Sequence, residues 1–251
     1  MRYALKIAYD GQYFHGFARQ PYIETVEGTL IQTCINNGIF EDTKTALFQS
    51  SSRTDKGVSS FGTVVAFNTE NKIQDNFFEL NNDMDHIVIY GISTVEFGFY
   101  PRYAKNRIYR YYLKKDGLDI DSLSLTAHLF IGTFDYSNFA KIEIGKNPIR
   151  TIDKITITQT KKFFIIDFHA QTYLWHQIRR IISAIIQVEQ GKITRDDIND
   201  ALKDSNKRVD LGLAPAKYLI LTDVEYDFSF SIDVESKKKR DELEQSLINS
   251  F

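Results

Sequence analysis

Alternating apolar and polar positions predict β-strands in several parts of the chain. The first lies at residues 3–9, where Tyr3, Leu5, Ile7 and Tyr9 share one face. Further strands are expected at 62–68, 87–92, 107–113 and 218–226. Residues 154–160 and 163–170 are expected to form a hairpin that turns at Lys161 and Lys162.

Apolar residues at helical spacing predict helices in three other segments. Residues 26–37 form the first, which ends at Asn37-Gly38, and residues 173–190 form the second, which ends at Gly191. A shorter helix is expected after Thr194, with Asp197 three residues on as a capping-box partner. The tail from Ser236 onward, which contains KKKR, favours a surface helix.

The order of these elements indicates an α+β fold. Several strands follow one another through short turns, with helices interspersed, which favours antiparallel pairing over a doubly wound parallel sheet. The character of the sequence changes near residue 100. We therefore expect an N-terminal half at residues 1–100 and a C-terminal half at residues 101–251.

Composition narrows the class of protein. The chain has 251 residues, 43% hydrophobic content and a net charge of −2, as in soluble globular proteins. The apolar run IRRIISAIIQV is short and interrupted by arginines, so no membrane span is expected, and MRYALKIAYD resembles neither a signal peptide nor a transit peptide. The use of a single cysteine fits a reducing cytoplasm, so a cytoplasmic protein is expected. The single cysteine, Cys34, fits a buried, inert thiol.

The sequence offers no metal or cofactor motif. Its five histidines are not paired at metal-ligand spacing, and no CxxC is present. A glycine-rich phosphate-binding loop is also missing from the sequence. We expect no metal and no small-molecule cofactor.

The segment SSRTDKGVSS contains one carboxylate, Asp55, between the cations Arg53 and Lys56. One interpretation is a plain turn, because Asp bonds its own backbone and Gly57 supplies a positive φ. The other is a rigid turn that holds a reactive carboxylate, kept ionised by its basic neighbours. A glycoside hydrolase would need a second acid, and nothing local supplies one.

A basic and aromatic segment covers residues 101–115. Its tyrosines alternate with six cations and no acid, the cations being Arg102, Lys105, Arg107, Arg110, Lys114 and Lys115. A solvated edge strand and a nucleic-acid surface both fit this pattern. The absence of acids favours RNA, which a chain of net negative charge can bind only through locally clustered cations.

A third segment, YLWHQIRRII at 173–182, places two arginines in an apolar helical pattern. Arg180 is expected at the surface. Arg179 shares a face with Trp175 and Ile182, so it is expected to be partly buried and to need a carboxylate. That carboxylate is either a structural acid or Asp55.

Together these segments resemble the TruA family of tRNA pseudouridine synthases. YDGQYFHGFARQ resembles the family's opening YDGxxFxGWQRQ, and SRTDKGVSS resembles GRTDxGVHA. TVEGTLIQ resembles the helix that follows the opening, RIYRY resembles RxYxY, HQIRRI resembles HxxRxI, and LAPAKYLILTDVEY resembles APxxGLxLxxVxY. The chain departs from these motifs at Phe17, Ala18, Ser52, Ser59, Ser60 and Tyr218.

The resemblance implies a pseudouridine-synthase-like fold, with two α/β halves and mixed, mostly antiparallel sheets around an active-site cleft. It implies isomerisation of uridine to pseudouridine at tRNA positions 38–40, in the anticodon stem-loop, by a homodimer without cofactor. Asp55 would be catalytic. Tyr109, Arg179, Arg53 and Arg110 would bind the substrate. The alternative is a non-catalytic RNA-binding or RNA-folding protein on the same fold.

Overall fold

The computed structural model describes residues 1–71, 73, 75–205 and 211–251, which form two compact units. Unit 1 comprises Met1–Lys105 and Ile220–Phe251, and unit 2 comprises Asn106–Leu219. The sequence places a boundary near residue 100 and leaves residues 220–251 in the second half, whereas the structure returns that segment to unit 1. A long-range strand pairing and a helix contact, both described below, account for this return.

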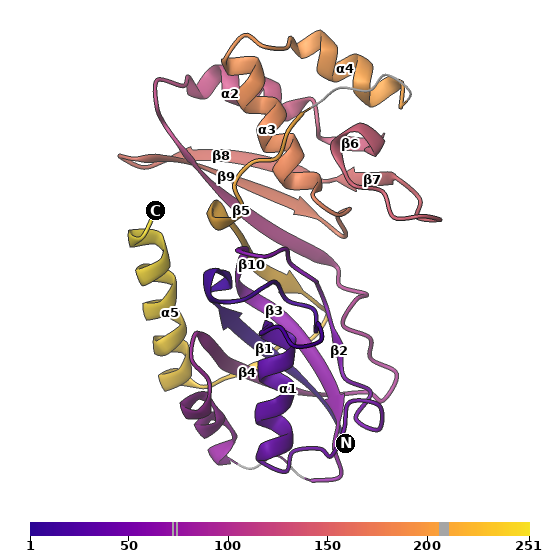
Figure 1. The fold of residues 1–251 in the computed structure, drawn as a ribbon, viewed down its shortest axis with the longest axis vertical. Coiled ribbons are helices and arrows are strands. Elements are labelled where there is room, and N and C mark those ends of the chain that lie inside the picture. The colour runs from indigo at the N-terminus through magenta and orange to yellow at the C-terminus, as the bar shows by residue number, and fades with distance from the viewer. Residues whose placement is uncertain (72, 74, 206–210) are drawn as a thin grey trace. The chain divides into compact units, whose positions relative to one another are not determined.

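The sheet of unit 1 is mostly antiparallel. Its strand order is β11-β4-β1-β3-β10, with the short β2 paired to β3 (Figure 1). The strands are β1 (Arg2–Tyr9), β2 (Gln49–Ser50), β3 (Ser59–Asn68), β4 (Ile87–Val95), β10 (Leu219–Glu225) and β11 (Ser231–Ile232). Only β10 runs parallel to its neighbour in this sheet, opposite Ser59 and Ser60 of β3. This pairing draws the chain after residue 219 back to unit 1.

Helix α1 (Val26–Asn36) covers one face of this sheet. Its residues Leu30 and Cys34 are fully buried in one cluster with Leu5 and Ile7 of β1. Thr25 caps the helix by accepting a hydrogen bond from the Gly28 backbone N–H. The alternation of β1 thus places its apolar side chains under the apolar stripe of α1.

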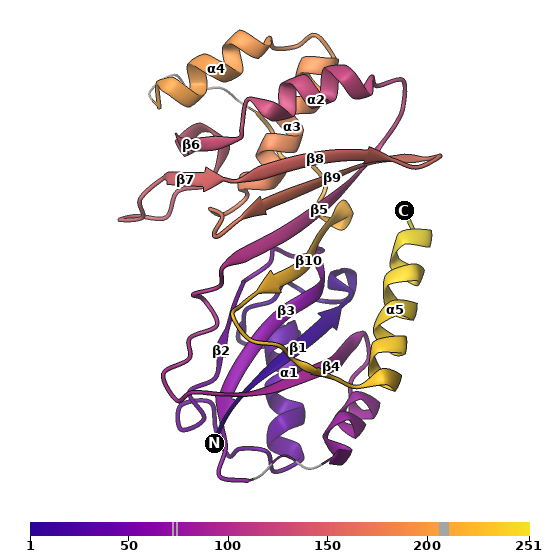
Figure 2. The same cartoon turned by 180° about the vertical axis from the view of Figure 1, so that it is seen from behind.

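The C-terminal helix α5 (Val234–Asn249) packs on β4. The Arg240 guanidinium lies 6.0 Å from the centre of the Tyr90 ring and 5.2 Å from that of Phe61. The amide of Asn81, in the 3₁₀ segment η2 (Asp75–Asp83), donates to the Ser236 hydroxyl at 3.0 Å. These contacts fix the tail to unit 1 (Figure 2).

Unit 2 contains an antiparallel sheet in the order β5-β9-β8 and a small sheet of β6 and β7. The strands are β5 (Asn106–Lys114), β6 (Gly132–Asp135), β7 (Ile149–Ile152), β8 (Lys154–Gln159) and β9 (Phe163–Ala170). The helices are α2 (Ile120–His128), α3 (Gln177–Glu189) and α4 (Arg195–Lys203). Helices α2 and α3 lie together on one face of the larger sheet (Figures 1 and 2).

The α+β prediction is confirmed, and so are the hairpin at Lys161-Lys162 and the capping box of Thr194 and Asp197. The second predicted helix begins at Gln177, four residues later than expected. Residues 173–176 are not helical: Trp175 forms an isolated antiparallel bridge with Lys141, whose N–H donates to the Trp175 carbonyl at 2.8 Å, and His176 has a φ of 64°. Helix α2 is not among the predicted elements.

Two further properties concern the described part of the chain. None of its helices is both long and apolar enough to cross a membrane. Nor do three or more of its His, Cys, Asp and Glu side chains gather where they could hold a metal ion. The Cys34 thiol is buried as predicted, and burial raises its pKa to about 12.

Candidate functional site

Asp55 begins a four-residue turn directly before β3. Its carbonyl accepts a hydrogen bond from the Val58 N–H at 3.1 Å, and Gly57 adopts a φ of 80°. This φ suits glycine, which has no Cβ to clash with the backbone. The turn predicted for DKGV is therefore confirmed, and the Asp55 side chain, which is half-buried, projects from a defined backbone.

The end of β1 and the segment after it hold this turn in place. The Tyr9 hydroxyl, at the end of β1, is completely buried and lies 2.9 Å from the Thr54 hydroxyl. The Phe17 N–H donates to the Thr54 carbonyl at 3.2 Å. A Cβ on Gly11 would lie 2.1 Å from the Val58 carbonyl oxygen, so only glycine allows this close approach. The YDGQYFHGF and SRTDKGV segments thus form one rigid assembly.

The cations beside Asp55 are turned outward. Arg53 and Lys56 are both exposed, while Thr54 between Arg53 and Asp55 is buried. This alternation leaves one partly buried carboxylate flanked by two solvent-facing charges. The carboxylate can act on a bound molecule, and the cations can meet an anionic one.

In unit 2, Tyr109 lies on β5 opposite Phe168 of β9. Its ring meets that of Tyr173 edge to face, with the ring centres 5.3 Å apart. The Tyr173 hydroxyl donates to the Arg107 carbonyl at 3.4 Å, and burial raises the pKa of this hydroxyl well above its usual value. Tyr109 is half-buried, so the edge-to-face contact orients its ring while part of its surface stays open.

Arg179 of α3 is anchored to the segment that precedes β10. Its Nε donates to the Ala214 carbonyl at 2.7 Å, and the Ala214 N–H donates to the Arg179 carbonyl at 3.2 Å. The Tyr111 hydroxyl donates to the next carbonyl, that of Pro215, at 3.3 Å. Burial raises the pKa of Tyr111, and the positive charge of Arg179 opposes that shift. The RIYRY, HQIRRI and LAPAKY segments therefore meet in unit 2.

The basic segment at residues 101–115 is partly used inside the protein. Arg110 binds Asp167 through both carboxylate oxygens, at 2.7 and 2.9 Å, and this contact raises the pKa of Arg110. Arg107 is buried and donates to the Gln171 carbonyl. Lys105 forms an ion pair with Asp227. Much of the charge that favoured RNA in the sequence is thus neutralised or buried by the fold.

The structure groups the candidate residues by unit. Arg53 and Asp55 belong to one turn in unit 1, whereas Tyr109, Arg110 and Arg179 belong to unit 2. Sequence reasoning from the patterns alone missed the supporting Tyr173, Tyr111 and Thr54. The segments SRTDKGVSS, RIYRY and YLWHQIRRII contain all three, but their roles depend on contacts between segments far apart in sequence.

Comparison with known proteins gives a consistent result. The family model described as tRNA pseudouridine synthase matches residues 126–227. The tRNA pseudouridine synthase A of Thermococcus sibiricus is 41% identical over 98% of this chain and 93% of its own length. That of Pyrococcus furiosus is 39% identical over 95% of this chain and 89% of its own.

The similarity to solved structures is weaker than the sequence similarity to these two proteins. The crystal structure of a Cbf5-Nop10-Gar1 complex aligns at 12% identity over 73% of this chain and 44% of the other, with a TM-score of 0.38. A likeness at this level carries no argument about function.

Proposed function

The chain belongs to the family of tRNA pseudouridine synthases and isomerises uridine in tRNA, and we propose that it uses Asp55 to do so in the anticodon stem-loop, at positions 38–40. The reaction breaks the N1–C1′ bond, turns the uracil, joins C5 to C1′ and removes the proton from C5. N1 takes up a proton in place of the one removed from C5, so the composition of the base is unchanged. A stacked base cannot undergo this chemistry, so the nucleotide must leave its stack.

The rigid turn of Asp55 is the observation that carries the proposal. A buried hydroxyl pair, a backbone hydrogen bond and a glycine contact all fix the residues around one half-buried carboxylate. Holding a reactive group in one geometry lowers the entropic part of a reaction barrier. A plain surface turn needs none of these supports. Asp55 would act on the sugar–base unit as nucleophile or base.

We propose that the residues of unit 2 bind and orient the substrate. The Tyr109 ring, held by Tyr173, would stack on the displaced uracil, because aromatic rings stack on bases of any sequence. Arg179 would pair with Asp55 and favour its ionised form. Its backbone anchorage to Ala214 supports this role, since a fixed arginine loses little freedom on pairing.

Charge supports a role for unit 2 in binding RNA. Residues 106–219 contain 18 Lys and Arg against 13 Asp and Glu, a net charge of +5, while the remaining residues contain 13 against 20, a net charge of −7. Arg53, which is exposed beside Asp55, would contact the RNA near the reacting nucleotide. Arg110 would contribute through its remaining donors, since Asp167 occupies Nε and Nη2.

The experiment that tests the site of modification uses an unmodified tRNA transcript with uridines in its anticodon arm. Carbodiimide labelling and primer extension map each pseudouridine. Primer-extension stops caused by labelled pseudouridine are expected only at positions 38–40. Stops only in another arm of the tRNA would contradict the anticodon assignment without touching the reaction type.

The homodimer and the cytoplasmic location implied by the resemblance are also proposals. Light scattering on the purified protein at micromolar concentration is expected to give twice the monomer mass of 29.1 kDa. A monomer mass that persists with bound tRNA would contradict the dimer. Fractionation of the source cells tests the location.

A further inference from the structure

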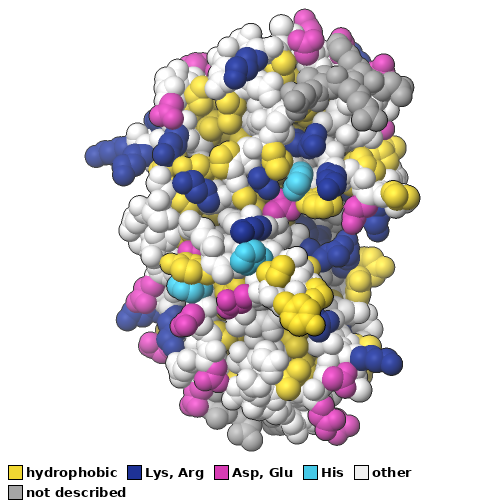
Figure 3. All heavy atoms as spheres, viewed as in Figure 1, with side chains coloured by type: hydrophobic (Ala, Val, Ile, Leu, Met, Phe, Trp, Pro, Cys, Tyr) yellow, Lys and Arg dark blue, Asp and Glu magenta, His cyan; other side chains and the backbone are white. Residues whose placement is uncertain are grey.

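The fold gathers five lysines at one end of the larger sheet in unit 2. Lys114 and Lys115 lie where β5 ends, and Lys161 and Lys162 form the turn between β8 and β9. The Lys115 N–H donates to the Lys162 carbonyl at 3.2 Å, so the two pairs are neighbours. Lys217, in the 3₁₀ segment η4 (Ala216–Tyr218), completes the group, called here the lysine end. Figure 3 shows basic side chains clustered where the β8–β9 hairpin projects.

An aromatic ring links Lys217 to the strand end. The Lys114 ammonium lies 5.9 Å from the centre of the Tyr218 ring, and the Lys217 ammonium lies 4.8 Å from it. The Tyr218 ring in turn meets Tyr111 edge to face, with the ring centres 6.2 Å apart. Tyr218 stands where the closing motif has a glycine, so this chain has at that position a ring over which two cations converge.

Ion pairs do not offset the charge of the lysine end within the described residues. In the parts of the chain that the structure describes, none of its five ammonium groups forms an ion pair. Asp116 follows Lys115 directly but pairs with none of them, and the Lys115 ammonium donates instead to the Gln159 side chain at 2.7 Å. Like charges held together repel each other, and an anion bound there would remove that repulsion.

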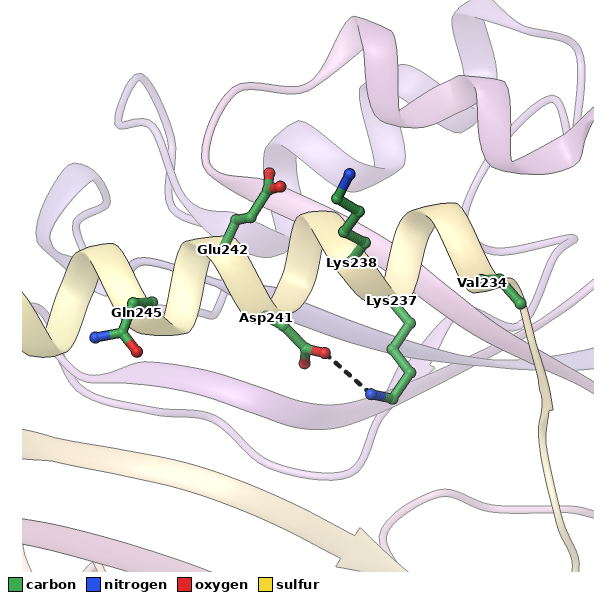
Figure 4. A pocket seen from close by; sticks show the side chains of 6 residues that line it. All are labelled: Val234, Lys237, Lys238, Asp241, Glu242 and Gln245. Atoms are coloured by element: carbon green, nitrogen blue, oxygen red, sulfur yellow. Dashed lines mark hydrogen bonds and ion pairs between the residues drawn. The ribbon is translucent and has the colours of Figure 1, made fainter.

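The KKKR run of α5 differs from the lysine end, because two of its cations form ion pairs. Lys237 pairs with Asp241 at 3.0 Å, and Arg240 pairs with Asp241 at 2.6 Å and with Glu244 at 2.7 Å. Figure 4 shows Lys238 beside Glu242 on the same helix. Two of the four cations in this run are therefore paired with acids of the same helix, whereas none of the five at the lysine end, which is built from three separate segments, forms an ion pair within the described residues.

We propose that the lysine end binds the phosphate backbone of the tRNA, away from the reacting base. Lys114 lies five residues along β5 from Tyr109, roughly 17 Å at the usual rise of a strand. This spacing corresponds to several base steps of a nucleic-acid helix. The lysine end therefore contributes affinity for the RNA rather than chemistry. The inference rests on tRNA as the substrate and uses the proposed position of the uracil at Tyr109 only for this distance.

The test compares two double variants of equal charge change. Lys161→Ala with Lys162→Ala removes two exposed cations of the lysine end, and Lys237→Ala with Lys238→Ala removes two from α5. Binding of the unmodified tRNA transcript is measured by filter binding between 0.1 and 1 M salt. The first variant is expected to reduce the magnitude of the negative slope of log K against log salt by about 1.4–1.8, since each phosphate contact contributes about 0.7–0.9.

This change in slope means that the lysine-end variant binds the tRNA roughly 25- to 60-fold more weakly than the original chain at 0.1 M salt. At 1 M salt, the two proteins are expected to bind with similar affinity. The α5 variant is expected to keep the original slope. Equal losses in both variants, or no loss in the first, would overturn the proposal. A thermal melt verifies that both variants fold.

Kinetics separate this inference from the proposed function. The lysine-end variant is expected to raise KM by a factor similar to its binding loss and to leave kcat unchanged. A lowered kcat at saturating tRNA would contradict a role restricted to binding. The role of Asp55 is judged independently, because the binding comparison requires no turnover.

Discussion

The contact between Gly11 and the turn of Asp55 gives the sharpest test of the site's rigidity. An alanine Cβ at position 11 would lie 2.1 Å from the Val58 oxygen and 2.4 Å from the Val58 carbon. Since real Cβ contacts essentially never fall below 3.0 Å, the backbone at Val58 must move by at least about 0.9 Å. Val58 closes the turn that begins at Asp55, so the carboxylate would move with it.

Two effects follow from that shift. Overpacking of a buried site costs about 1–3 kcal/mol of unfolding free energy, or about 2–12 °C in Tm for a chain of this size. A displacement of a reacting group by about 1 Å costs about 100-fold in rate. Gly11→Ala is therefore expected to lower kcat about 100-fold at a temperature where a circular-dichroism melt shows the variant folded.

Gly98→Ala is the matched control. Gly98 is exposed, and its added Cβ would meet nothing within 4 Å, so kcat and Tm should both stay at their original values. Pseudouridine is quantified by carbodiimide labelling for all three proteins. If Gly11→Ala keeps both the melting temperature and the rate of the original chain, the close approach does not constrain the turn and the reasoning is refuted.

Three other contacts give predictions of their own. Thr54→Val removes the hydroxyl that faces Tyr9 and should cost about 1 kcal/mol in urea unfolding, an effect that should vanish in a Tyr9→Phe background. Asp167→Asn breaks the two-point pairing with Arg110 and should cost about 1 kcal/mol, because the pair is partly exposed; unchanged stability in low salt would show that the pair contributes nothing. Cys34, whose thiol pKa burial raises to about 12, should resist iodoacetamide at pH 8.5 until the protein is unfolded, and rapid alkylation of the native protein would contradict its burial.

The sequence predicts local elements well, because their signals are local. Strand β1 shows a period of two, the β8–β9 hairpin has two polar residues at its turn, and the capping box lies within four residues. Helix α2 was missed because its segment, IDSLSLTAH, carries a mixture of serine and leucine with little apolar periodicity. The start of α3 was misplaced because Trp175 instead forms a β-bridge with Lys141, which lies 34 residues earlier.

Long-range contacts explain the remaining differences. Residues 220–251 return to unit 1 because β10 pairs with β3, a pairing between segments about 160 residues apart that no local pattern encodes. Charge neutralisation also depends on contacts between distant segments.

Six cations within 14 residues suggested one RNA surface, but acids from β9 and from the segment after β10 form ion pairs with two of these cations. The sequence pattern does not predict the lysine end, because its residues come together only when β5, β8 and β9 pair.

Isomerisation of an unmodified tRNA transcript by the original chain, by Asp55→Asn and by Asp85→Asn tests the central claim most directly. Asp85 is an exposed carboxylate of the same unit, so its variant controls for the loss of one negative charge. Pseudouridine is expected with the original chain and with Asp85→Asn, and none with Asp55→Asn, which should still bind the tRNA with similar affinity. Turnover by Asp55→Asn at a rate near that of the original chain would contradict the assignment of the chemistry to Asp55.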